Sequence, residues 1–169
     1  MRFRPALYID YEYNTWVYSP ETRKAGETME DSKRRLMWHG MFLFLLGLLT
    51  GFLEQKFVNP RMGLAAHLEG VMNGIFLLAL GAAWTEVRLS PRLKLAAYWA
   101  ALYGAYVNWA AVILAAIFGT AALSPITSAG HSALPWQEGL VTVALLTVGI
   151  SIVGSSLLVL WGLRRKAAE

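Results

Sequence analysis

Apolar residues dominate the chain after residue 35 and fall into four runs separated by short polar segments. The runs cover residues 36–53, 64–84, 95–118 and 139–163. A helix needs about 20 residues to cross ~30 Å of hydrocarbon, and each run is close to that length. Because a backbone in lipid must satisfy its own hydrogen bonds, these runs predict helices. The pattern therefore predicts an all-α fold, a four-helix bundle that crosses a membrane.

Residues 1–35 have a different character. They hold seven of the fifteen Lys and Arg residues and six of the eleven Asp and Glu residues. They contain no apolar stretch of the ~7–15 residues that form the core of a signal peptide. We expect residues 1–35 to form a cytoplasmic extension and residues 36–166 to form the catalytic four-helix domain.

Lys and Arg are distributed unequally between the two sides that four spans would create. Nine lie near the helices on the side of the two termini, and only Lys56 and Arg61 lie on the other side. Such an excess marks the cytoplasmic side of a membrane protein. We therefore expect both termini to be cytoplasmic.

Composition agrees with a membrane protein. Of the 169 residues, 56% are hydrophobic and 15% are charged, against about 45–50% and about 25% in ordinary soluble domains. The mean hydropathy is +0.44. The chain has no cysteine, which excludes disulfides, thiolate nucleophiles and Cys-ligated metals. Since the loops account for the net charge of +4, we expect no nucleic-acid partner.

Polar groups inside a span are costly and indicate function, and the second run carries the most. At ~100° per residue, His67, Gly70 and Gly74 share one helix face, whereas Glu69 and Asn73 share another about 120° away. The two glycines would leave a flat strip for a planar group, and the single histidine is typical of an axial haem ligand. Two alternatives stay open: Gly70 and Gly74 as a helix-packing motif, and Glu69 near the membrane surface.

The other runs carry fewer polar groups. His39 follows three basic residues, so it can also lie at the membrane interface. Asn108 in the third run needs a partner if buried. Helix packing is the expected role of Gly47 and Gly51. The same role is expected for the hydroxyls of the fourth run, Thr147, Ser151 and Ser155. Three aromatic residues form a stripe along the third run: Trp99, Tyr103 and Tyr106.

Several chemistries are absent from the pattern. It has no hydrolase triad, zinc-protease motif, phosphate loop or dinucleotide fingerprint. Glu69 is the only carboxylate within a run, which excludes hydrolysis by paired carboxylates. A haem-binding electron-transfer or sensor subunit, with His39 as the second iron ligand, and a small-solute transporter stay open.

Three motifs carry a resemblance. They are His39-Gly40, then Ala66-His67 with Asn73-Gly74 six residues beyond His67, and finally Tyr106-Val107-Asn108-Trp109. Together they resemble the small membrane isomerases that include styrene oxide isomerase and hydroxylaminobenzene mutase, over roughly Lys33 to Arg165. The match looks closer to the mutase branch.

The resemblance implies a homotrimer in the inner membrane of a bacterium, with haem b at the subunit interfaces. His67 would be the axial ligand of a ferric, five-coordinate or weakly six-coordinate iron. Gly70, Gly74 and His39 would lie at the cofactor. Asn73 would lie on the substrate side, with Tyr106, Asn108 and Glu69 as further catalytic candidates. The haem would act as a Lewis acid.

The mutase branch converts an aryl hydroxylamine into an aminophenol, and a related lyase yields a catechol and ammonia. In the epoxide-isomerase pattern a tyrosine follows the third-helix asparagine by four residues, but here that position is Val112. This departure favours hydroxylamine over epoxide substrates. We expect Asn73 and Asn108 to position the substrate and Glu69, Tyr106 or water to move a proton.

Overall fold

The computed structural model describes residues 7–10, 15–18, 20–128 and 130–164, with side chains from residue 30 onward. A β-hairpin comes first, with β1 (Leu7–Asp10) antiparallel to β2 (Thr15–Tyr18). The helices follow in the order α1 (Pro20–Gly51), the short 3-10 helix η1 (Glu54–Lys56), α2 (Pro60–Ala83), α3 (Pro91–Phe118), α4 (Pro125–Ser128) and α5 (Pro135–Arg164). The described chain is thus helical from Pro20 onward, and the hairpin is an exception to the all-α expectation.

Helix α1 is longer than the first apolar run. It contains 32 residues and starts well before the expected boundary at residue 36. Glu, Lys, Arg, Ala and Met dominate the segment before that boundary, and these residues favour helices whether or not lipid surrounds them. The boundary between extension and span therefore lies inside one continuous helix, because hydrophobicity changes there and helix propensity does not.

Proline begins each of the five α-helices. It suits the first turn, whose N–H groups have no partner within the helix. For this reason α2, α3 and α5 each begin four residues before the apolar runs that predicted them. At the start of α2, Asn59 accepts a hydrogen bond from the Met62 backbone N–H at 3.2 Å. At the end of α3, Gly119 has a φ of 74°, a left-handed conformation that favours glycine.

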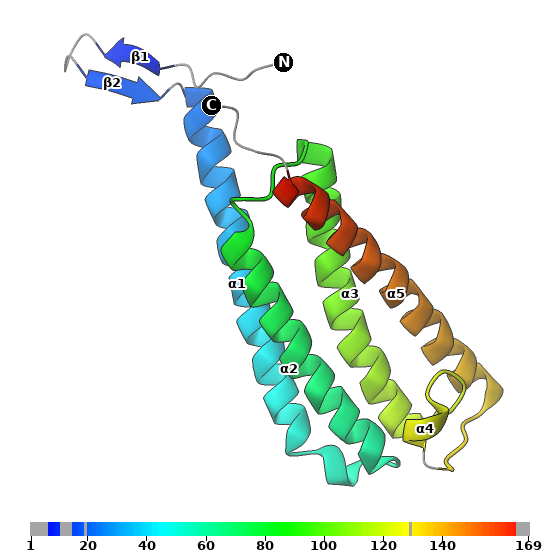
Figure 1. Cartoon of the computed structure of the whole chain (residues 1–169). Helices are drawn as coiled ribbons and strands as arrows, with labels where there is room; N and C mark the ends of the chain where they lie inside the picture. The colour runs from blue at the N-terminus through cyan, green and yellow to red at the C-terminus, as the bar shows by residue number, and fades with distance from the viewer. Residues whose placement is uncertain (1–6, 11–14, 19, 129, 165–169) are drawn as a thin grey trace.

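The four long helices form an antiparallel row. Helix α1 packs along α2, α2 along α3, and α3 along α5 (Figure 1). Across the described residues, α5 makes no extensive contact with α1 or α2. Leu43 of α1 shares a buried cluster with Ala101 and Ala105 of α3, so α1, α2 and α3 pack together and α5 adds to this group along α3. Large hydrophobic side chains stay exposed along α5, for example Val143, Ile150 and Leu157.

Glycines allow α1 and α2 to approach each other closely. A Cβ atom on Gly47 would lie 2.5 Å from the Val71 backbone nitrogen, and one on Gly74 would lie 2.6 Å from the Phe44 nitrogen. At Gly51 a Cβ atom would lie 2.8 Å from Nδ1 of His67. The helix-packing interpretation of these glycines is therefore confirmed.

Three of the described helices are long and apolar enough to cross a membrane: α2, α3 and α5. The apolar part of α1 starts at Leu36, and the helix ends at Gly51, before the run itself ends. A fourth span thus stays a prediction. The end of α2, the start of α3 and the end of α5 lie at the same end of the molecule, beside the middle of α1 (Figure 1). The backbone N–H of Arg88, in the turn between α2 and α3, donates to the Gly162 carbonyl of α5 at 3.2 Å. Two members of the basic group, Arg165 and Lys166, lie outside the described residues.

A substitution in the α1–α2 contact should destabilise the fold. In Gly40→Ala, the new Cβ would meet the Leu78 nitrogen at 2.7 Å and the Gly74 carbonyl oxygen at 2.8 Å. Since neither backbone can move alone, we expect a loss of about 1–3 kcal/mol in the free energy of unfolding in detergent. Gly149→Ala is the matched control, because no atom lies within 4 Å of its Cβ position. Equal stability of the two variants would contradict the contact.

Candidate functional site

A polar cluster lies between α2 and α3, within their apolar stretches. The Glu69 carboxylate accepts a hydrogen bond from Nδ2 of Asn73 at 3.1 Å and another from Nδ2 of Asn108 at 2.6 Å. All three side chains are half-buried. Glu69 and Asn73 share a face of α2, as their spacing predicted, and the partner that Asn108 needed is Glu69. The cluster thus joins three of the four predicted catalytic residues through one carboxylate oxygen.

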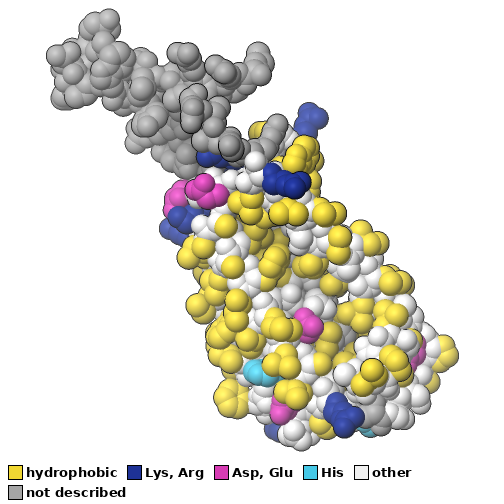
Figure 2. Space-filling view, viewed as in Figure 1, with side chains coloured by type: hydrophobic (Ala, Val, Ile, Leu, Met, Phe, Trp, Pro, Cys, Tyr) yellow, Lys and Arg dark blue, Asp and Glu magenta, His cyan; other side chains and the backbone are white. Residues whose placement is uncertain are grey.

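The Glu69 carboxylate lies within the apolar run of α2, where charged side chains are rare. It lies nine residues after the start of α2, which is about 13 Å along the helix axis. Since α2 begins four residues before its apolar run, the alternative of Glu69 near the membrane surface stays open. It forms no ion pair with any described residue, so neutral amides are its only donors there. A carboxylate inside an apolar stretch that is oriented by two amide donors is a candidate for acid–base chemistry. Figure 2 shows one acidic side chain alone among hydrophobic ones midway along this face.

His67 points to the other side of α2, toward α1. Its Nδ1 lies 2.8 Å from the Gly47 carbonyl oxygen. A carbonyl only accepts hydrogen bonds, so Nδ1 must carry the proton and Nε2 keeps its lone pair. Metal-bound histidines commonly use their second nitrogen in this way. In this tautomer, Nε2 is the nitrogen of His67 that could bind a metal ion.

The strip beside His67 is not open. On Gly70, a Cβ atom would lie 2.5 Å from the Cα of Gly47, and on Gly74 it would meet the backbone of Phe44. Helix α1 therefore fills the surface on which a planar group was expected to lie. The expectation of a flat, empty strip at Gly70 and Gly74 was wrong, because these glycines bring two helices together.

His39 and Tyr106 form a second polar contact nearer the basic end. Nδ1 of His39 lies 3.0 Å from the Tyr106 hydroxyl, which also lies 3.3 Å from the His39 carbonyl oxygen. His39 precedes Gly51 by twelve residues, and Gly51 packs on His67. This separation along α1 corresponds to about 18 Å. His39 and His67 of one chain are therefore too far apart to ligate one iron atom. An electron-transfer subunit in which both histidines of the same chain hold the haem iron is excluded.

Trp109 forms a link between α3 and α1 that the sequence pattern did not predict. The indole Nε1–H of Trp109 donates to the Thr50 hydroxyl at 3.2 Å, and that hydroxyl donates to the Leu46 carbonyl at 2.8 Å. The sequence did contain a signal for this link, since Trp109 directly follows Asn108 in one of the three motifs.

The three aromatic residues of the third run do not all contact the Glu69 cluster. The Tyr103 hydroxyl instead lies 2.9 Å from the Thr147 hydroxyl on α5. Packing of the fourth-run hydroxyls is confirmed at Ser155, which donates to the Ala97 carbonyl at 2.9 Å.

The donor set limits the cofactors that could bind. Among the described residues, no group of three or more His, Asp or Glu side chains could hold a metal ion. A group that needs a single protein ligand, such as haem, is compatible with His67 and its fixed tautomer. Val112 is buried with Met62 and Ala66 in an apolar cluster, so that position offers no hydroxyl.

Comparison with known proteins adds a family. The family described as styrene oxide isomerase matches residues 32–164 of the chain. The chain belongs to the styrene oxide isomerase family. HabB, a hydroxylaminobenzene mutase of Ectopseudomonas oleovorans, is 48% identical over 137 residues, which cover 80% of this chain and 84% of HabB. The hydroxylaminobenzene mutase HabA of the same organism is 40% identical over 127 residues, which cover 75% of this chain and 94% of HabA. No solved structure matches the chain.

Family membership confirms the resemblance that the three motifs predicted. The matched residues begin in α1 and end with α5, and they include the cluster and both histidines. The chain is therefore an isomerase and, by its three long apolar helices, a membrane protein.

The Glu69 cluster should contribute measurably to the stability of this isomerase. In Asn108→Ala the carboxylate loses its shorter hydrogen bond, and we expect a loss of about 1–2 kcal/mol in the free energy of unfolding. In a Glu69→Gln background the same substitution should cost less, because the charge-assisted bond is already gone. Tyr103→Phe is the control, since it removes an exposed neutral hydrogen bond to Thr147. Purely additive effects of Asn108→Ala and Glu69→Gln would contradict the coupling.

Proposed function

We propose that the chain is a membrane-bound mutase that converts an aryl hydroxylamine into an aminophenol. The observation that carries this proposal is the similarity to two hydroxylaminobenzene mutases, at 48% and 40% identity over most of the chain. The Glu69 cluster adds chemical support, because the reaction needs a proton carrier in an apolar site. Val112 supports a hydroxylamine over an epoxide as substrate, since it leaves that position without a phenol.

The balance of the reaction defines what the protein must do. One N–O bond breaks, one C–O bond forms at the ortho carbon, and one proton moves from that carbon to nitrogen. We assign this proton transfer to the Glu69 carboxylate, which Asn73 and Asn108 orient by hydrogen bonds of 3.1 and 2.6 Å. The amides keep oxygen Oε2 occupied, so Oε1 is the atom that would take the proton. An apolar site also limits attack by water on the reactive intermediate.

Haem b is the proposed cofactor, held by Nε2 of His67. Two observations support the fit: the Nδ1–H bond to the Gly47 carbonyl fixes the tautomer that a ligand needs, and His67 is only half-buried. When bound, ferric haem supplies Lewis acidity that weakens an N–O bond. The glycines beside His67 would not contact it, since α1 covers them.

We further propose that the site forms between subunits of a homotrimer. His67 faces α1 and Glu69 faces α3, so one chain does not present both to the same small molecule. A neighbouring copy would supply the half-buried His67 of its own chain to the half-buried Glu69 cluster of the first. The exposed apolar side chains of α5 offer further contact area or a lipid-facing surface.

The proposed location is the inner membrane of a bacterium, with four spans and both termini in the cytoplasm. Helix α1 supports the fourth span, because its apolar part lies antiparallel along α2 for most of the length of α2 (Figure 1). Two helices in such contact share the same depth in the bilayer.

The activity test uses purified protein and hydroxylaminobenzene in the absence of oxygen. We expect 2-aminophenol as the product and no requirement for nicotinamide or flavin, since the reaction involves no net redox change. Glu69→Gln should lower kcat by about 10²–10⁴-fold, the usual contribution of a general base. Tyr103→Phe should retain activity. Release of ammonia with a catechol would indicate a lyase instead, and no turnover would refute the assignment.

The cofactor test measures haem content independently of activity. His67→Ala should lose the Soret absorption of the purified protein, because it removes the only ligand assigned to the iron. His39→Ala is the matched control on α1 and should keep the wild-type haem content. Normal haem content in His67→Ala would refute the ligand assignment, and a six-coordinate spectrum abolished by His39→Ala would revive the electron-transfer alternative.

A further inference from the structure

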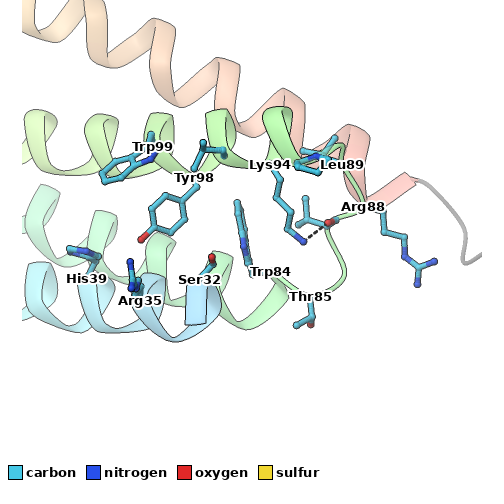
Figure 3. Close-up of a pocket in the computed structure, with 13 residues that line it drawn as sticks. Ser32, Arg35, His39, Trp84, Thr85, Arg88, Leu89, Lys94, Tyr98 and Trp99 are labelled. Atoms are coloured by element: carbon cyan, nitrogen blue, oxygen red, sulfur yellow. Dashed lines mark hydrogen bonds between the residues drawn. The ribbon is translucent and has the colours of Figure 1, made fainter. Parts of the chain in front are cut away.

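A cavity of about 590 Å³ lies at the basic end of the molecule, apart from the Glu69 cluster. It lies between α1, the turn that follows α2 and the first turns of α3 (Figure 3). This volume is within the ~300–1,000 Å³ of typical small-molecule sites. The proposed reaction assigns no role to this space.

The cavity has a cationic lining. Among the described residues that line it, Arg35, Arg88 and Lys94 are basic and none is acidic. Nζ of Lys94 is held by a 2.8 Å hydrogen bond to the Val87 carbonyl and lies 5.4 Å from the ring centroid of Trp84. In Figure 3, Arg88 points away from the other labelled side chains. Arg35 from α1 and Lys94 from α3 are therefore the lining cations, and in Figure 3 the Trp84 ring lies between them.

Hydrogen-bond donors accompany these cations. The Tyr98 hydroxyl points toward Arg35 and His39, and Ser32 lies on the same side of α1 (Figure 3). A guanidinium, an ammonium and hydroxyl donors together suit phosphate or carboxylate oxygens. This combination predicts an anionic group as the ligand.

The outer wall of the cavity is apolar and accessible from the side of the molecule. Leu95 is 58% exposed and Trp99 is 60% exposed, and both lie on α3. Tryptophan is enriched where membrane meets water. A ligand with its anionic group at Arg35 would therefore extend an apolar body past these two side chains into the lipid.

We propose that this cavity binds the headgroup of an anionic phospholipid, with its phosphate at Arg35 and Tyr98, in the field of Lys94, and an acyl chain along Leu95 and Trp99. Basic pockets between helices at the cytoplasmic side of a membrane bind such headgroups. A free amphiphilic acid has the same chemistry, but the opening toward the lipid-facing side favours a membrane lipid.

The experiment measures retained lipid by native mass spectrometry on the full-length protein. The protein is exchanged into detergent with equal amounts of dioleoylphosphatidylglycerol and dioleoylphosphatidylcholine, and in a parallel sample with free oleate. Arg35→Gln and Lys94→Gln each remove one lining cation, whereas Arg92→Gln removes an exposed cation of α3 that does not line the cavity. Arg35→Gln is the safer variant, because the Arg35 side chain forms no hydrogen bond with another described residue.

We expect the wild type to retain phosphatidylglycerol in preference to phosphatidylcholine. Each lining substitution should lower this preference about five-fold, the equivalent of ~1 kcal/mol per cation, and Arg92→Gln should leave it within about two-fold of wild type. Equal retention of the two lipids, or an equal effect of Arg92→Gln, would overturn the proposal. Binding of oleate without phosphatidylglycerol would overturn the phospholipid as the source. None of these results depends on isomerase activity.

Discussion

The close approach of α1 and α2 is the contact on which the rest of the structure depends. Glycines on both helices leave no room for a Cβ atom, so the two backbones touch. This proximity brings the Gly47 carbonyl within 2.8 Å of His67 Nδ1. In lipid there is little hydrophobic force between helices, so such contacts and a few polar bonds must hold them together. One contact therefore supports both the fold and the orientation of the candidate ligand.

Helix α2 carries its polar side chains on two different faces. One face touches α1 and carries His67, and the other touches α3 and carries the Glu69 cluster. A carboxylate is costly in an apolar layer unless its oxygens are occupied. The amides of Asn73 and Asn108 both donate to one oxygen of this carboxylate. These two hydrogen bonds partly offset the cost of its burial, and they fix the orientation of the carboxylate between α2 and α3.

The sequence predicted the elements better than their arrangement. Apolar runs located four helices, and the spacing of Glu69 and Asn73 placed both on one face. The sequence did not reveal the extent of α1, because charged helix formers precede the apolar run. Nor did it predict that α5 packs along α3, or the Glu69–Asn108 bond, since both depend on how α3 packs against its neighbours. Gly70 and Gly74 show the limit most directly, because a strip of small residues suits a planar ligand and a neighbouring helix equally well.

His39 and His67 differ in the helix that supplies their hydrogen-bond partner. A backbone carbonyl of α1 accepts from Nδ1 of His67, so in the neutral ring the lone pair lies on Nε2. The Tyr106 hydroxyl of α3 donates its one proton to the His39 carbonyl, so it accepts from Nδ1 of His39 at 3.0 Å and leaves the lone pair on Nε2 there as well. The tautomer therefore does not distinguish the two side chains. Their positions do, because Gly51 of α1 packs against the His67 ring, whereas His39 lines the cavity at the basic end.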